Sequence, residues 1–155
     1  MEYRIATKED IDMIMSIRLE MLRKVNELSD DFVFTDAFIA NSKRYFLEGN
    51  QTTAIALKNG KIVACASMSY IEMMPTFSHP TGNRAHLMNV YTNADYRRRG
   101  VARKLVQMLI DKAKEKGVTE ISLDATDSGR TLYETLGFCA SDECMVMNLG
   151  SCRQM

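Results

Sequence analysis

The sequence of 155 residues contains no tryptophan and only two prolines. Its formal net charge is zero, because 20 lysine and arginine residues balance 20 aspartate and glutamate residues. Proteins that bind nucleic acid generally carry an excess of positive charge. The balanced charge therefore argues against a nucleic-acid partner. A membrane-spanning helix needs about 20 consecutive apolar residues, and the sequence has no such run. We therefore expect no membrane partner.

Targeting signals and metal-ligand patterns are also lacking. The segment Met1–Ile5 has no apolar region of the kind found in signal peptides. Cys65, Cys139, Cys144 and Cys152 show neither CxxC spacing nor a zinc-ligand pattern. Cysteines of this kind are reduced thiols in the cytosol. The sequence therefore predicts a cytoplasmic protein without a metal site.

The remaining composition is that of an ordinary globular domain. Hydrophobic residues make up 46% of the sequence and charged residues 26%, which is typical of soluble proteins. A chain of this length can build one substantial core. We therefore predict a single domain over residues 1–155.

Hydrophobic spacing and turn residues predict six strands and four helices in the order β-α-α-β-β-β-α-β-α-β. Asn59-Gly60 is a strong hairpin signal between the second and third strands. The predicted strands are Glu2–Ala6, Thr52–Leu57, Ile62–Tyr70, Arg84–Thr92, Val118–Ala125 and Phe138–Met147. The predicted helices run from Thr7 to about Leu28, over Asp36–Leu47, from Arg99 to Gly117 and over Asp127–Leu136.

The stretch His86–Arg103 contains a strand, a tight turn and the start of a helix. The first N–H groups of a helix lack internal partners and lie at the positive end of the helix dipole, so they bind phosphate readily. Gly100 and Ala102 add little bulk there, while the arginines at 97–99 supply charge and bidentate donors. This arrangement suits a pyrophosphate. A solvated basic helix start is the alternative.

Two motifs resemble those of the GCN5-related N-acetyltransferases, the GNAT superfamily. Arg97-x-x-Gly100-x-Ala102 is similar to the Arg/Gln-x-x-Gly-x-Gly/Ala signature that binds the pyrophosphate of acetyl-CoA in that family. The segment Gly129–Phe138 resembles the family pattern Ala-x-x-Leu-Tyr-Glu-x-x-Gly-Phe, with glycine in place of the usual alanine. The two motifs together cover the C-terminal half of the chain.

The resemblance implies an α/β (α+β) GNAT fold with a mixed central sheet of six to seven strands and about four flanking helices. The sheet is expected to be splayed between its fourth and fifth strands, with acetyl-CoA as the cofactor in the splay. Strand backbone at Val90, Tyr91 and Thr92 is expected to pair with pantetheine. Thr126, where many members have asparagine, is a further pantetheine contact. The expected pyrophosphate residues are Arg98, Arg99, Gly100, Val101, Ala102 and Arg103.

Tyr133 is the candidate general acid. The resemblance implies that its phenol protonates the departing CoA thiolate. A thiol has an ordinary pKa of about 8.5 and a phenol about 10, so a positioned phenol can donate as the thiolate leaves. The alternative is a structural tyrosine whose ring packs on the helix.

His86 is the candidate general base, because some branches of the family place a glutamate at the corresponding position of the fourth strand. Histidine side chains exchange protons near neutral pH and so suit this role. A strand histidine that faces no substrate is an equal alternative. Glu72 and His79 are weaker candidates in or near the proline-containing loop, and water can also accept the proton.

The motifs favour an acetyl-CoA-dependent N-acetyltransferase in which a primary amine of a small molecule or peptide attacks the thioester directly. The loop Ile71–Asn83 and the first two helices are expected to border the acceptor site. A non-catalytic acyl-CoA sensor with the same fold is the alternative. The sequence names no acceptor. Homodimers are common in the family, so a homodimer is compatible with the resemblance.

Overall fold

A computed structural model describes residues 1–150, so Cys152 lies outside the described residues. The chain forms two compact units, which divide after Asp124. The first unit runs from Met1 to Asp124 and contains a mixed sheet with helices on both sides. The second unit begins at Ala125 and contains the helix α4 (Asp127–Thr135).

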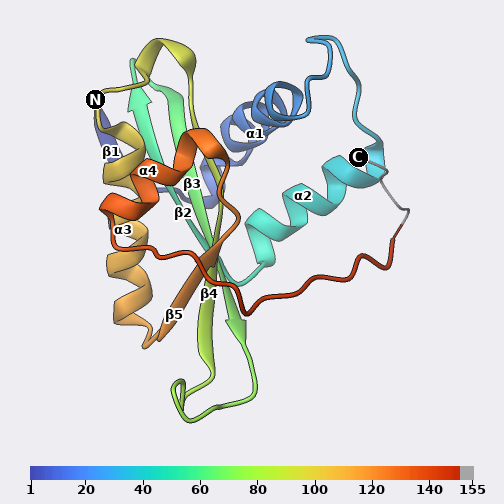
Figure 1. The fold of residues 1–155 in the computed structure, drawn as a ribbon. Helices are drawn as coiled ribbons and strands as arrows, with labels where there is room; N and C mark the ends of the chain where they lie inside the picture. The colour runs from blue at the N-terminus through green and yellow to red at the C-terminus, as the bar shows by residue number, and fades with distance from the viewer. Residues whose placement is uncertain (151–155) are drawn as a thin grey trace. The chain divides into compact units, whose positions relative to one another are not determined.

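The first unit holds a five-stranded sheet in the order β1-β2-β3-β4-β5, in which only β4 and β5 are parallel. Helices α1 and α2 lie on one side of this sheet and α3 on the other (Figure 1). The strands are β1 (Glu2–Ile5), β2 (Gln51–Lys58), β3 (Lys61–Glu72), β4 (Asn83–Thr92) and β5 (Glu120–Leu123). The α-helices are α1 (Ile11–Val25), α2 (Asp36–Glu48) and α3 (Val101–Glu115), and the short 3-10 helices are η1 (Lys8–Asp10) and η2 (Ala94–Tyr96).

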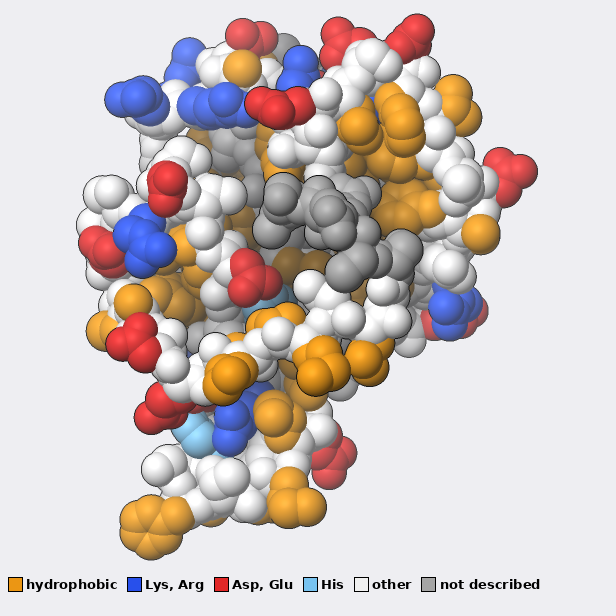
Figure 2. All heavy atoms as spheres, turned by 45° about the vertical axis from the view of Figure 1, so that its right-hand side comes forward, with side chains coloured by type: hydrophobic (Ala, Val, Ile, Leu, Met, Phe, Trp, Pro, Cys, Tyr) orange, Lys and Arg blue, Asp and Glu red, His pale blue; other side chains and the backbone are white. Residues whose placement is uncertain are grey.

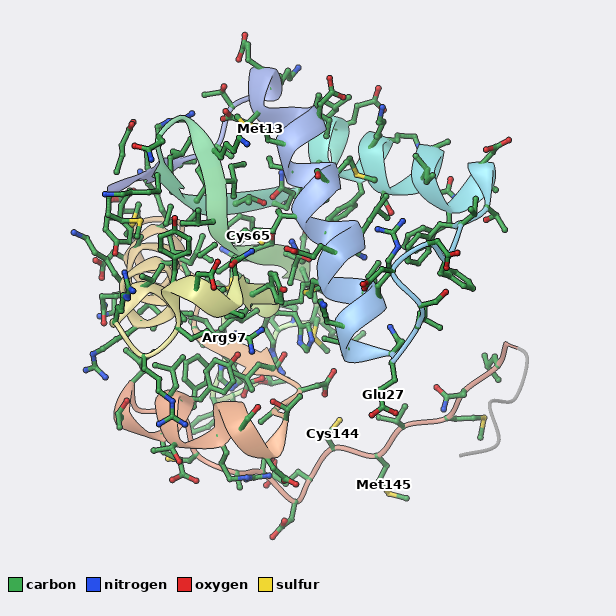
Figure 3. The ribbon with its side chains drawn as sticks, turned by 90° about the horizontal axis from the view of Figure 1, so that it is seen from above. Met13, Glu27, Cys65, Arg97, Cys144 and Met145 are labelled. Atoms are coloured by element: carbon green, nitrogen blue, oxygen red, sulfur yellow. The ribbon has the colours of Figure 1, made fainter. Side chains whose placement is uncertain are left out.

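The predicted last strand, Phe138–Met147, is wrong, since this segment has no strand in the described part of the chain. The described sheet therefore has five strands rather than the six to seven expected. Met145 and Met147 are 94% and 81% exposed, so the segment gains no burial that would favour a strand. Figure 3 shows Cys144 and Met145 on this irregular stretch.

The core of the first unit lies on both faces of the sheet. On one face α3 packs against β2 and β3, and its Leu105 and Leu109 are fully buried. On the other face Ile17 of α1 belongs to a cluster with Cys65 and Tyr91, and Figure 3 shows Cys65 on the sheet beside α1. No helix in the described residues is long and apolar enough to cross a membrane.

Strand β4 changes register at Asn89. This residue has a φ of 57°, and the pairing with β3 shifts between Met88, opposite Ser67, and Tyr91, opposite Cys65. Such a bulge bends the strand and adds a residue on one side only. Because asparagine tolerates the left-handed conformation better than most residues, the sequence permits the bulge here.

Strands β4 and β5 are paired only up to the register pair Leu87–Leu123. Their parallel pairing begins at Arg84 opposite Glu120 and ends at that pair, whereas β4 continues to Thr92. The pairing ends because β5 itself ends at Leu123, and the splay that the resemblance implied stays a prediction. The backbone of the last β4 residues has no described strand partner on the β5 side.

The start of α1 is fixed by Asp10. Nη1 and Nη2 of Arg4 donate to its carboxylate, at 2.7 and 2.9 Å, and the Thr7 N–H donates to it at 2.8 Å. The Arg4 hydrogen bonds lower the pKa of Asp10 from 3.8 to about 2, although its burial opposes the shift. This carboxylate links β1 to α1 and so sets the position of the whole helix.

We expect Asp10→Asn to lower the free energy of unfolding at pH 7 by about 1–2 kcal/mol, allowing for the partial exposure of Arg4. Because the native pKa is lowered, the stabilisation is full above pH 3.8 and disappears as the pH falls towards 2. Urea unfolding at several pH values measures this difference. Asp12→Asn removes a carboxylate that is 89% exposed and is the control. An equal, pH-independent loss in both variants would contradict the assignment.

Candidate cofactor and acceptor site

The loop that enters α3 has the backbone expected of an anion site. Gly100, the N-cap residue, has a φ of 76° and offers no capping side chain. A Cβ atom placed there would meet nothing within 4 Å outside its two chain neighbours, so the described residues leave room beside Gly100. Arg98 also adopts a left-handed conformation, with a φ of 59°. Such conformations cost non-glycine residues about 1 kcal/mol or more.

The arginines of this loop have different surroundings. Arg98 and Arg99 are exposed, and the Arg99 guanidinium lies 5.6 Å from the ring centroid of Tyr96. Arg97 instead turns back towards β4, where its Nε donates to the Thr92 carbonyl oxygen at 2.9 Å. Arg97, which is exposed as well, therefore holds the loop against the strand, and Arg98 and Arg99 supply charge at the helix start.

The remaining predicted loop residues lie within the first turn of α3. Val101 is buried and anchors the turn, Ala102 is half-buried, and Arg103 is exposed. Because the helix N-terminus carries partial positive charge, this turn and the exposed arginines form one electropositive surface. The chemistry of the donors fits a phosphate group.

The predicted pantetheine strand is the part of β4 beyond the bulge. Val90 and Thr92 are half-buried there and Tyr91 is buried. Burial raises the pKa of the Tyr91 phenol above its ordinary value, which is consistent with a core side chain. The contribution of this segment is its backbone, because N–H and C=O groups on the β5 side need partners that an extended amide chain can provide. The Thr92 carbonyl already accepts one bond, from Arg97.

The second unit contains the other predicted site residues, Thr126 and Tyr133. Thr126 is the N-cap of α4, and its hydroxyl accepts a hydrogen bond from the Gly129 N–H at 3.3 Å. A capping role thus uses the hydroxyl that was expected to contact pantetheine. Burial raises the pKa of the Tyr133 phenol, and its ring packs against Phe138 with centroids 5.9 Å apart.

The presence of glycine rather than alanine at position 129 has a local structural explanation. A Cβ at this position would lie 3.0 Å from Cε2 of the Tyr133 ring, which is closer than side chains usually approach. Glycine in place of the family's alanine therefore leaves room for the tyrosine ring over the first turn of α4.

His86 is held by two residues of the neighbouring strand region. Its Nδ1 lies 2.7 Å from Ser122 Oγ, and its Nε2 lies 3.6 Å from an Asp124 carboxylate oxygen. Ser122 Oγ donates to the Ala85 carbonyl oxygen at 3.4 Å, so it can accept from an Nδ1–H. That tautomer leaves a lone pair on Nε2, and Asp124 can stabilise the imidazolium formed after proton uptake.

The weaker base candidates lie on the projecting β3–β4 hairpin (Figure 1). His79 has an arrangement like that of His86, with Nδ1 at 2.9 Å from Thr119 Oγ1 and Nε2 at 3.3 Å from Glu120. Glu72 is exposed at the end of β3. Met74 and Phe77 are 85% and 104% exposed, and Figure 2 shows hydrophobic side chains on this projection. The loop is thus exposed at these residues, and its expected place beside the acceptor site stays a prediction.

The face of the sheet beneath α1 and α2 carries a polar group that the sequence did not reveal. Arg18 Nη1 donates to Asn89 Oδ1 at 2.9 Å, and Asn89 Nδ2 donates to Ser67 Oγ at 3.5 Å. On the same strand, Ser69 Oγ lies 2.6 Å from the Tyr45 hydroxyl. An asparagine within a strand and an arginine within the apolar stripe of a helix were the available signals.

Comparison with known proteins identifies the class. The family model described as "Acetyltransferase (GNAT) family" matches residues 12–138. The chain therefore belongs to the GNAT acetyltransferase family, as the two motifs indicated.

Individual relatives support this membership. A glucosamine 6-phosphate N-acetyltransferase of Trypanosoma brucei brucei is 32% identical over 58% of this chain and 59% of its own length. The ribosomal protein bS18-alanine N-acetyltransferase of Escherichia coli K12 is 37% identical over 36% of this chain and 40% of its own. The chain thus matches about half of the length of these curated relatives.

A solved structure extends the likeness to nearly the whole fold. The crystal structure of a predicted acetyltransferase from Clostridium acetobutylicum with acetyl-CoA superposes with a TM-score of 0.83 and 28% identity, over 96% of both chains.

We expect Gly100→Glu to abolish the thermal stabilisation of the protein by CoA, because it puts bulk and negative charge at the expected pyrophosphate position. Gly60→Glu is a matched control: Gly60 has the same φ of 76°, and a Cβ placed there would likewise meet nothing within 4 Å, but it lies in the β2–β3 hairpin. Both variants should lose similar intrinsic stability, and only the first should lose the CoA-dependent shift in Tm. A shift that survives Gly100→Glu would refute the assignment.

Proposed function

We propose that this protein is an acetyl-CoA-dependent N-acetyltransferase that transfers the acetyl group to a primary amine by direct attack on the thioester. Two features of a GNAT acetyltransferase carry the proposal: an α3 N-terminus without a capping side chain, and the end of β4, which has no strand partner on the β5 side. Arg98, Arg99 and the first turn of α3 would hold the pyrophosphate, and β4 beyond the bulge would hold the pantetheine amides.

Acetyl-CoA supplies the thioester carbon that the neutral amine attacks. A carbon–nitrogen bond forms and the carbon–sulfur bond breaks. A backbone N–H in the Val90–Thr92 segment would donate to the carbonyl oxygen, where negative charge develops. The segment is rigid because it continues a paired strand, so the donor is already oriented when the charge appears.

Two side chains would complete the proton transfers. Tyr133 would donate its phenolic proton to the departing sulfur, and His86 would take the proton released by the attacking amine. Because burial raises the pKa of Tyr133, the phenol keeps its proton at neutral pH and is available as a donor. Asp124, beside Nε2 of His86, would stabilise the imidazolium.

We expect Tyr133→Phe to lower turnover roughly ten- to a thousandfold, in or just below the usual range for one general acid, while CoA affinity changes little. The loss should shrink for thioesters with more acidic leaving thiols, which need less protonation. Tyr3→Phe is the control, since it removes a phenol from β1, where no catalytic role is proposed. Steady-state rates at saturating acetyl-CoA measure the effect.

The pH profile provides a second measurement of Tyr133. Its deprotonation should produce an alkaline limb above the ordinary value of 10.0, and this limb should be absent from Tyr133→Phe. If the variant instead weakens CoA binding and keeps wild-type turnover, the phenol is a structural or binding group.

We expect His86→Ala to lower the acetylation rate most at neutral pH and below, with a changed acidic limb of the pH–rate profile. His79→Ala is the matched variant, because each histidine contacts one hydroxyl and one carboxylate of the β5 region. If the acidic limb changes only in His79→Ala, then His79 on the hairpin, and not His86, is the general base. An unchanged limb in both variants would leave Glu72 or water as the proton acceptor.

A sensor that binds acyl-CoA without turnover is the second candidate. The observation in its favour is that His79 and His86 have like surroundings, so the geometry singles out neither as a dedicated base. Tight acetyl-CoA binding without transfer to any amine would establish this function.

The proposal of an N-acetyltransferase also includes a cytoplasmic location, a single domain over residues 1–155 and a homodimer. The relatives act on glucosamine 6-phosphate and on the alanine of ribosomal protein bS18, so a sugar phosphate and a peptide amine both remain acceptor classes.

A further inference from the structure

Arg18 lies on α1 with its guanidinium directed at the sheet. Its Nη1 donates to Asn89 Oδ1 at 2.9 Å, and Asn89 is only 8% exposed. The guanidinium carbon lies 5.9 Å from the ring centroid of Phe38 on α2. The charged group of this half-buried residue thus lies between α1, α2 and the bulge of β4, all of which belong to the first unit.

Arg18 has no counterion among the described residues. Within residues 1–150 it forms no ion pair, and its one hydrogen bond uses one of the five N–H donors of a guanidinium. The neighbouring Cys65 provides no counter-charge, because burial raises the pKa of this thiol to about 12. Burial also lowers the pKa of Arg18 itself, although a guanidinium keeps its charge at any physiological pH.

A partly desolvated cation without a counterion is unfavourable. An anion that binds there would recover the lost solvation through charge-assisted, bidentate hydrogen bonds. The partner of Arg18, Asn89, immediately precedes the strand segment Val90–Thr92 that would hold the thioester. An acceptor that places its amine at this segment could therefore reach Arg18 with an anionic group of its own.

We propose that Arg18 forms an anion subsite that selects acceptor amines carrying a carboxylate or a phosphate close to the amino group. This inference rests on the proposed function, since it specifies the acceptor of the same site. Arg18 is a specificity-determining residue in this view, and Asn89 is a positioning residue that orients its guanidinium. Polycationic amines would be disfavoured by the same charge.

Equilibrium binding to the CoA-saturated protein tests the subsite without requiring turnover. The probes are two pairs of amines that differ in the anionic group: O-phosphoethanolamine with ethanolamine, and β-alanine with propylamine. The wild type should bind at least one anionic member roughly tenfold or more tightly than its neutral partner, as expected for hydrogen bonds to a charged group. The pair that shows the larger ratio distinguishes phosphate from carboxylate. Isothermal titration calorimetry measures each ratio.

Arg18→Gln should reduce that ratio to about one while leaving the neutral amine and CoA unaffected, because glutamine keeps an N–H donor but loses the charge. Arg18→Lys should restore part of the preference. Arg23→Gln is the matched control: it removes a second arginine of α1, whose Nε donates to the Phe32 carbonyl oxygen at 3.1 Å. This control should keep the wild-type ratio.

Equal binding of both members of each pair by the wild type would overturn the subsite, as would a preference that persists in Arg18→Gln. If Arg18→Gln does not fold, the wild-type ratio and its reduction in Arg18→Lys decide. Acetylation rates separate the two proposals. An anion preference without transfer of the acetyl group counts against the transferase only, whereas transfer without an anion preference counts against the subsite only.

Discussion

The bulge at Asn89 is the constraint on which the candidate site depends. It is a left-handed residue in the middle of a buried strand. This conformation costs free energy, and hydrogen bonds of its side chain offset part of the cost. Arg18 holds the amide oxygen and Ser67 accepts from the amide nitrogen. The bulge turns β4 after Met88 and precedes the segment that leaves β5. Asn89 thus lies between two features: it contacts Arg18 on the face beneath α1, and it precedes the β4 segment that has no strand partner on the β5 side.

Helix α1 determines whether the bulge can be held, because Arg18 must be at the right depth over the sheet. The start of α1 is fixed by the bidentate pair of Arg4 with Asp10, and Ile17 anchors it in the core cluster with Cys65. An ion pair remote from the site therefore sets the position of a site side chain. Such a pair contributes to geometry as well as to the free energy of unfolding.

The sequence predicted the elements whose signals are local. Asn59-Gly60 gave the hairpin, and hydrophobic spacing gave α3. The splay between strands four and five was expected only because of the resemblance to the GNAT family. The predicted strand Phe138–Met147 failed because β propensity does not specify a partner strand. The pairing of Arg18 with Asn89 was not predictable, since it joins residues 71 positions apart in the sequence. The roles of the predicted loop residues remain predictions.

The site combines two features that stability alone would not select. Arg98 keeps a left-handed backbone at the start of α3, and Arg18 keeps a charge without a counterion in the described chain. Each is unfavourable in the free protein. On the proposed assignments, a phosphate at α3 and the anionic group of an acceptor at Arg18 would offset these costs. The two arginines belong to different elements: Arg98 precedes α3, and Arg18 lies on α1. Binding of the two substrates can therefore be altered separately, by substitutions at Gly100 and at Arg18.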